Sequence, residues 1–169
     1  MTHIEEKLNL LNREMVTMFV LVLSQLKKAK QALLYLDKDL AREILSTEKR
    51  VNAQELKIDR DCENAIALYQ PVAIDLRYVL ALLKINNNLE RTGDIAEGIA
   101  KFILDTQKPI DKELFEVAEV IEMFNQAIAM SEDIESAFTN EDTALARTIF
   151  KQDEILDEIN RSANKRIAA

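Results

Sequence analysis

The chain has 169 residues, 48% of them apolar, which is enough to bury a core as one domain or two small ones. Its 22 basic residues against 30 acidic ones give a net charge of −8, which argues against a nucleic-acid partner. The single cysteine, Cys62, excludes an internal disulfide framework. The longest mostly apolar run, Met15 to Leu23, is far shorter than the roughly 20 residues that span a bilayer. We therefore expect a cytoplasmic protein without membrane insertion.

The first half of the chain reads as long helices. The whole chain contains only two glycines and two prolines, and apolar residues recur at helical spacing from end to end, so the predicted fold class is all-α. A first helix is expected from about Thr2 to Leu36, with an apolar seam that one polar residue, Gln25, interrupts. Asp39 is a plausible N-cap for a second helix that reaches Tyr69.

Pro71 predicts the next boundary, because proline disfavours helix at the residue before it and is itself accepted at a first helical position. A third helix then runs to about Leu104. The segment 105–111, which contains Pro109, is the best linker in the chain, and two further helices are expected at about 112–138 and 141–167. The predicted units are therefore residues 1–106 and 107–169.

An internal repeat appears when the chain is shifted by 105 positions, the difference between Leu40 and Leu145. The repeat predicts tandem three-helix bundles in which the third helix of the second unit would fall near residues 176–209, so five long helices are expected with the sixth absent. Apolar surface left on the unfinished unit predicts a homodimer or a larger complex. The identities at this offset are Met18 and Phe19 with Met123 and Phe124, Ala32 with Ala137, Asp37 with Asp142, Leu40-Ala41-Arg42 with Leu145-Ala146-Arg147, and Ile44 with Ile149.

Acidic and amide residues flank the predicted turn at Pro71. In two antiparallel helices joined there, facing residues have numbers that sum to about 142. Side chains four residues apart lie one turn apart on the same face, so they form a ladder of oxygen ligands suited to hard cations. The alternative is an ordinary solvated helix face. The predicted pairs are Glu48 with Asp94, Asn52 with Glu90, and Glu55 with Asn87.

Four segments then give a family resemblance. Gln70-Pro71-Val72-Ala73, Asp75-Leu76-Arg77, Leu89-Glu90-Arg91 and Gly93-Asp94 resemble the signature of the PhoU family of phosphate-signalling proteins. The resemblance implies tandem three-helix units and a cytoplasmic regulator that restrains the phosphate-starvation response. Its implied partners are the ATPase of a phosphate ABC transporter, a sensor histidine kinase, or both.

The resemblance also implies metal binding at motifs of two acids four residues apart. The motif of the third helix falls on Glu90 and Asp94, and that of the second helix on Glu48 and Asn52, where asparagine replaces the usual acid. The repeat carries the motif to Asp153 and Asp157, whose facing helix would be the absent one. Divalent or trivalent ions are expected, with Mg²⁺, Mn²⁺, iron and Zn²⁺ all left open.

An enzyme is not expected. His3 is the sole histidine, and no glycine-rich phosphate loop, nucleophile elbow or cysteine–histidine pair occurs. Two alternatives to the leading function remain open: a regulatory domain or paralogue acting on a sodium-coupled phosphate transporter, and a metal-binding or storage protein without a signalling role.

Overall fold

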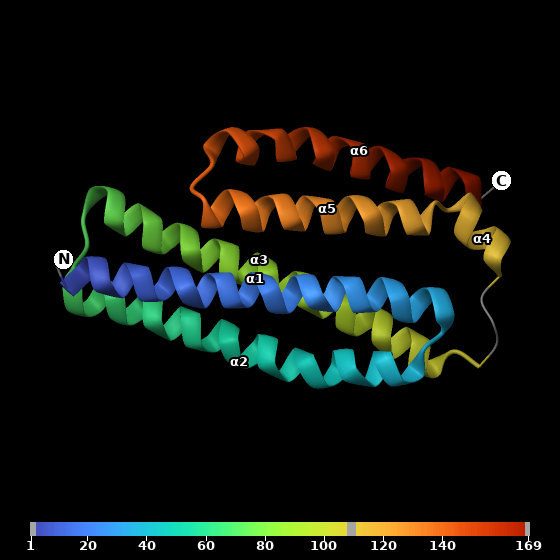
Figure 1. Ribbon diagram of the computed structural model, residues 1–169, viewed down its shortest axis with the longest axis horizontal. Helices are drawn as coiled ribbons and strands as arrows, with labels where there is room; N and C mark the ends of the chain where they lie inside the picture. Colours follow the sequence, from blue (N-terminus) through green and yellow to red (C-terminus); the bar gives the residue numbers. More distant parts are fainter. Residues whose placement is uncertain (1–2, 108–110, 168–169) are drawn as a thin grey trace.

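The computed structural model describes residues 3–107 and 111–167, and at residues 112, 114, 117, 164 and 167 it describes the backbone alone. The all-α class is confirmed. None of the helices in this described part is long and apolar enough to cross a membrane. Within it the chain forms six helices and no strand (Figure 1): α1 (His3–Tyr35), α2 (Lys38–Tyr69), α3 (Ala73–Asp105), α4 (Lys112–Val117), α5 (Val120–Thr139) and α6 (Thr143–Ile167).

The ends of α2 follow from its flanking residues. Asp37, not the expected Asp39, is the N-cap, because its carboxylate accepts hydrogen bonds from the backbone N–H groups of Asp39 and Leu40. At the other end Gln70 adopts a left-handed conformation and its N–H bonds to the carbonyl of Ile66. Helix α3 begins at Ala73, two residues later than the start expected at Pro71.

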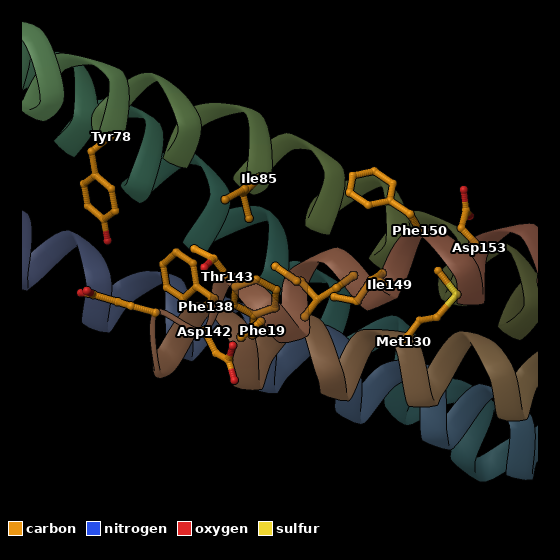
Figure 2. A pocket seen from close by; sticks show the side chains of 14 residues that line it. Phe19, Tyr78, Ile85, Met130, Phe138, Asp142, Thr143, Ile149, Phe150 and Asp153 are labelled. Atoms are coloured by element: carbon orange, nitrogen blue, oxygen red, sulfur yellow. The ribbon is translucent and has the colours of Figure 1, made fainter.

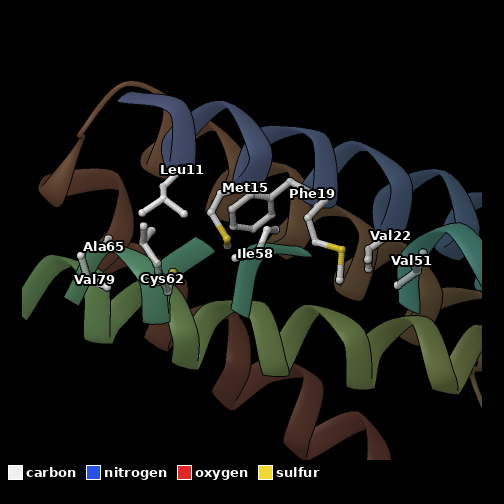
Figure 3. Packing of buried hydrophobic residues seen from close by; sticks show 11 residues of the cluster. Leu11, Met15, Phe19, Val22, Val51, Ile58, Cys62, Ala65 and Val79 are labelled. Carbon is white, nitrogen blue, oxygen red and sulfur yellow. The ribbon is translucent and has the colours of Figure 1, made fainter. Parts of the chain in front are cut away.

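Helices α1, α2 and α3 form a three-helix bundle with two contiguous apolar clusters. Figure 3 shows the first, in which Leu11, Met15 and Phe19 of α1 pack against Ile58 of α2 and its neighbours. The second cluster is rich in alanine, and small side chains allow the three helices to lie close together at that end of the bundle. Its buried members are Ala29, Ala32, Ala41, Ile44, Ala96, Ala100 and Ile103.

The fourth helix expected from the sequence, 112–138, is interrupted. Helix α4 ends at Val117 and α5 begins at Val120, because Glu119 takes a left-handed conformation with φ 51° and ψ 35°. A β-carbon disfavours that conformation, so the periodic pattern alone did not predict the break. Pro109, central to the expected linker, lies outside the described residues, as does Thr2 at the start of the first helix.

Helix α5 packs along α1 (Figure 1), and α6 packs on α5 and α4. The rings of Phe19 and Phe138 lie 5.3 Å apart between centroids, tilted by 45°. Polar contacts continue along the same antiparallel line, since Lys27 pairs with Glu132 at 2.6 Å. Within the described part of the chain α6 has no packing contact with α1, α2 or α3, so its other face is left without a neighbouring helix.

The turns of the two helical hairpins are built alike. Asp142 caps α6 by accepting from the N–H groups of Ala144 and Leu145, as Asp37 caps α2. The residues before these caps, Leu36 and Glu141, both have positive φ, 50° and 54°. The same backbone bonds close both turns, from Asp37 to Ala32 at 3.0 Å and from Asp142 to Ala137 at 2.9 Å. The two hairpins, α1–α2 and α5–α6, therefore share the capping and closing bonds of their turns.

Candidate functional site

The seam between α2 and α3 brings the predicted ligand residues onto neighbouring helices. Its register agrees with the sequence prediction to within about one residue. Asn86 donates to the carbonyl of Glu55 and to Oδ1 of Asp59, both at 2.9 Å, while a β-carbon added to Gly93 would lie 3.1 Å from Oε2 of Glu48. The facing partner of Glu55 is thus Asn86 rather than the expected Asn87, which is exposed.

Glu48 points into the bundle and is 2% exposed. Its Oε2 accepts a hydrogen bond of 2.9 Å from Nε2 of Gln25, and among the described residues Oε1 has no hydrogen-bond partner. Burial raises the pKa of Glu48, and the charges of Asp94, Glu97 and Glu90 raise it further, against the opposing hydrogen bond from Gln25. Glu48 is therefore a buried carboxyl group beside an acidic surface.

Glu90 and Asp94 form a close carboxyl pair on α3. Burial raises the pKa of Glu90, and the charge of Asp94 and the hydrogen bond between the two groups raise it further, against the opposing charge of Arg91. Burial likewise raises the pKa of Glu55, followed by the charges of Asp59 and Glu90. Acidic groups from both helices therefore repel one another along one edge of the bundle.

The pair Glu90 and Asp94 fits a hard cation, because two carboxylates one turn apart repel until a positive charge lies between them. The predicted set of four ligands, Glu48, Asn52, Glu90 and Asp94, fits a cation less well than this pair. Glu48 is hydrogen-bonded inside the bundle, and Asn52 is exposed and uncharged. No three His, Cys, Asp or Glu side chains of the described residues converge tightly enough to enclose an ion. An ion held by Glu90 and Asp94 would need water or amide oxygens to complete its coordination.

The second predicted pair lies elsewhere. Asp153 and Asp157 are exposed on α6, and Asp153 lines a groove between α6, α5 and the first bundle. The described residues place no helix opposite them in the way that α3 lies opposite Glu48. The structure thus leaves the two predicted pairs in different surroundings.

Comparison with known proteins decides the family. The family model described as the PhoU domain matches residues 15–103 and 120–169, which is most of the chain. The chain belongs to the PhoU family. The crystal structure of the phosphate transport system regulatory protein PhoU from Streptococcus pneumoniae superposes with a TM-score of 0.86 at 28% identity, covering 98% of this chain and 77% of that one.

PhoU relatives known by sequence agree. The phosphate-specific transport system accessory protein PhoU homolog 1 of Thermotoga maritima is 30% identical over 164 residues, which are 96% of this chain and 70% of the relative. The accessory protein PhoU of Escherichia coli is 32% identical over 152 residues, covering 90% of this chain. The chain spans only 62% of the Escherichia coli PhoU, less than two thirds of its length.

The sequence pattern assigns no partner to two buried polar residues, Gln25 of α1 and Asn86 of α3. Gln25 is a polar interruption of the apolar face of α1, and Asn86 is the first of three consecutive asparagines. A polar residue at a core position is itself a signal that a buried partner exists, because unpaired buried amides are disfavoured. The identity of that partner, Glu48, required the packing of α1 against α2.

Proposed function

We propose that this protein is a cytoplasmic regulatory accessory protein of phosphate transport. In this proposal it lowers phosphate uptake and phosphate-starvation signalling by binding the ATPase of a phosphate ABC transporter, a sensor histidine kinase, or both. The supporting observation is the agreement of family and fold: a PhoU match over both helical units, and a TM-score of 0.86 to a protein titled phosphate transport system regulatory protein.

Binding rather than catalysis suits the side chains present. The sole histidine, His3, is exposed near the start of α1. Cys62 is buried, and burial together with the charges of Asp59 and Asp61 raises its pKa to about 11, so the thiol stays protonated at neutral pH. The proposed task therefore depends on surfaces that meet other proteins.

A phosphate-starvation reporter tests the proposal. In a strain that lacks this gene, grown with abundant phosphate, the reporter should rise, and the wild-type gene should restore repression. A reporter unaffected by the deletion would contradict the proposal and favour a metal-storage role. Altered phosphate uptake that depends on sodium, without a change in the reporter, would instead favour action on a sodium-coupled carrier.

We also propose that Glu90 and Asp94 hold a divalent or trivalent ion, the support being the repulsion within this carboxyl pair. Elemental analysis of purified protein should show metal that is lost in the Glu90→Ala, Asp94→Ala double variant. A matched control is the double variant Glu154→Ala, Glu158→Ala, which removes two exposed acids four residues apart on α6. Equal metal content in all three proteins would contradict the site.

The elemental analysis also tests Asp153 and Asp157. They stay a proposed second site, so Asp153→Ala, Asp157→Ala should lower metal content independently of Glu90 and Asp94. The homodimer also stays a prediction. One chain has a mass of 19.3 kDa. Static light scattering at micromolar concentration should give twice this mass, and the mass of a monomer would contradict the predicted dimer.

A further inference from the structure

The outer face of α2 carries only positive charge over its central turns. Between residues 44 and 62 none of the exposed side chains of this helix is acidic, although the whole chain has a net charge of −8. The acids of this segment are instead buried or half-buried: Glu48, Glu55, Asp59 and Asp61. We call the exposed residues Ser46, Lys49, Arg50, Ala53, Leu56, Lys57 and Arg60 the basic stripe.

Most cations of the basic stripe are available to a partner. Within the described part of the chain Lys49, Arg50 and Arg60 form no ion pair. Lys57 pairs with Glu14 at 2.6 Å, but its side chain stays 47% exposed. Lys57 and Arg60 are three residues apart, so they lie on the same side of the helix and repel each other. Acidic groups placed against the stripe would relieve this repulsion.

The basic stripe lies on the side of α2 that no described helix covers. Helix α2 packs against α1 and α3 and contacts none of the other described helices. Figure 1 shows α1 between α2 and α5. The groove in Figure 2, between α5, α6 and the first bundle, is lined by no residue of α2. The stripe is therefore separate from that groove, and a further helix packed on α5 and α6 would leave the stripe open.

The spacing within the basic stripe suits a second helix laid along α2. Alternating intervals of three and four residues keep the contacts between two long helices in line. The residues at this spacing are Ser46, Lys49, Ala53, Leu56 and Arg60. Leu56 is 67% exposed, and the short side chain of Ala53 beside it leaves room for an apolar residue of the partner. The remaining cations, Arg50 and Lys57, flank this line and face acids along the side of such a helix.

Acidic residues limit the basic stripe at both ends and favour a narrow partner. Glu43 and Glu63 are exposed just beyond its ends, so the stripe covers about four helical turns, roughly 22 Å. A membrane surface or a nucleic acid would also meet these acids, because charges act over about 10 Å in dilute salt. A single helix about 10 Å wide would meet the stripe alone. Two copies of the chain meeting through the stripe would bring like charges together.

We propose that the basic stripe binds one acidic amphipathic helix of a partner protein, in which aspartate or glutamate flanks a narrow apolar line. The cations of the stripe pair with these acids, and Leu56 packs against the apolar line. The site deepens the function proposed above, on which it rests, by assigning the surface of this protein that meets its regulatory partner.

A fluorescent peptide tests the basic stripe directly. The probe is a synthetic helix of about 21 residues, or three heptads, in which leucine and alanine alternate along one line. Glutamate flanks this line on both sides, and glutamine fills the far face. Fluorescence anisotropy against the 169-residue protein should show saturable binding. The same peptide with lysine in place of each glutamate should bind at least about tenfold more weakly.

Two matched double variants locate the binding. Lys49→Glu, Arg60→Glu should weaken the acidic peptide at least about tenfold. Lys84→Glu, Arg147→Glu makes the same change of charge at exposed residues of α3 and α6, and should weaken it less than about twofold. Circular dichroism checks that both variants remain helical. Absence of acidic-peptide binding to the wild-type protein, or equal loss in both variants, would overturn the proposal.

Two further measurements test direct contact with a helix. The lysine peptide should bind the Lys49→Glu, Arg60→Glu variant more tightly than it binds wild type, and no such reversal would overturn the proposal. Leu56→Ser should weaken the acidic peptide at least about threefold, because it removes the apolar contact and leaves every charge in place. Unchanged binding in this variant would show attraction by charge alone, without the packed helix proposed.

Competition separates the other anionic partners and a second copy. Vesicles of phosphatidylglycerol and phosphatidylcholine, or duplex DNA, should displace the labelled peptide less well than the unlabelled peptide does at equal negative charge. Better displacement by either would assign the stripe to that surface and overturn the proposal. A concentration-dependent dimer that Lys49→Glu, Arg60→Glu abolishes and the control variant preserves would assign the stripe to a second copy, with the same consequence.

The deletion strain distinguishes the stripe from the function on which it rests. The wild-type gene and the Lys84→Glu, Arg147→Glu gene should restore repression of the reporter, and the Lys49→Glu, Arg60→Glu gene should not. A wild-type gene that does not alter the reporter would contradict the proposed function. A wild-type gene that restores repression, together with a Lys49→Glu, Arg60→Glu gene that does so equally well, would contradict the stripe alone.

Discussion

Gly93 on α3 faces Glu48 on α2 so closely that a β-carbon would lie 3.1 Å from Oε2 of Glu48. The same β-carbon would lie 3.2 Å from Oε1 of Gln25 and from Cγ1 of Val51. These neighbours are buried and hydrogen-bonded or packed, so they have little room to move. Glycine is therefore needed at position 93 for packing, since its backbone is ordinary helix.

Substitution of the two glycines should separate packing from helix propensity. Gly93→Ala should lower the free energy of unfolding by about 1–2 kcal/mol, because the gain in helix propensity is outweighed by displaced neighbours. Gly98→Ala is the matched control, with nothing within 4 Å of the added β-carbon, and should raise it by about 0.5–1 kcal/mol. Urea unfolding of the three proteins measures both values, and equal gains in the two variants would contradict the packing role.

Glu48→Gln should stabilise the protein at neutral pH by on the order of 1 kcal/mol. The amide keeps an oxygen that accepts from Gln25, and it removes a buried carboxyl charge that Asp94, Glu97 and Glu90 disfavour. Glu48→Ala is the control and should be destabilising, because it leaves Nε2 of Gln25 without this partner. The measurement is chemical denaturation, and a glutamine variant with a lower free energy of unfolding than wild type would refute this account.

Glu14 should make stability depend on acid pH. Hydrogen bonds from Lys57 and Gln54, with the charge of Lys57, lower its pKa from 4.5 against the opposing effect of burial. The lowered pKa means that its contribution is present above pH 4.5 and is lost as pH falls through the folded-state pKa. Glu14→Gln should therefore cost about 1 kcal/mol at pH 7 and little at pH 3.

The control for Glu14 is Glu132→Gln. Its ion pair with Lys27 is 2.6 Å long but both side chains are about half exposed, so water screens it. Denaturation curves at pH 7 and pH 3 should show a smaller pH-dependent difference for this variant than for Glu14→Gln. Matching pH profiles for the two variants would show that the burial of the Glu14 carboxylate, which is 16% exposed, is irrelevant.

The two capping aspartates should act on different parts of the chain. Asp37→Ala and Asp142→Ala should each destabilise by about 1 kcal/mol, because each leaves two N–H groups at a helix start without their side-chain acceptor. Hydrogen exchange should show faster exchange in α6 for the Asp142 variant, while α2 is affected in the Asp37 variant. Asparagine at either position should retain most of the stability, and an asparagine variant as weak as alanine would contradict the capping role.

Phe138 and Phe150 should differ in how much each contributes to stability, because one ring packs between helices and the other is exposed. Phe138→Ala should cost about 2–3 kcal/mol, because its half-buried ring packs against Phe19 and holds α5 to α1. Phe150→Ala should change stability by less than about 0.5 kcal/mol, since the ring is 73% exposed. Thermal unfolding compares them, and a large loss in the Phe150 variant would show that it packs within the chain.

The sequence predicted much of how the acidic residues of α2 and α3 face each other. The antiparallel register of α2 and α3 followed from one proline, Pro71, and the observed contact between Asn86 and Glu55 lies one residue from the expected pair. The break between α4 and α5 was not foreseen, because a single left-handed residue, Glu119, leaves no trace in the periodicity of the apolar positions. The predicted pairing of facing residues also could not show that Glu48 points into the bundle while Asn52 is exposed.

The sequence by itself determined the all-α class and the family, because apolar spacing and signature residues are local properties of the chain. Only the tertiary structure decided which carboxyl groups share an environment. The burial of Glu48 depends on Gln25 from α1 and on the missing side chain of Gly93 from α3. The open groove likewise depends on how α5 docks on α1, which leaves one face of α6 without a neighbour in the described chain. Burial is set by neighbours from other helices, and no single segment contains that information.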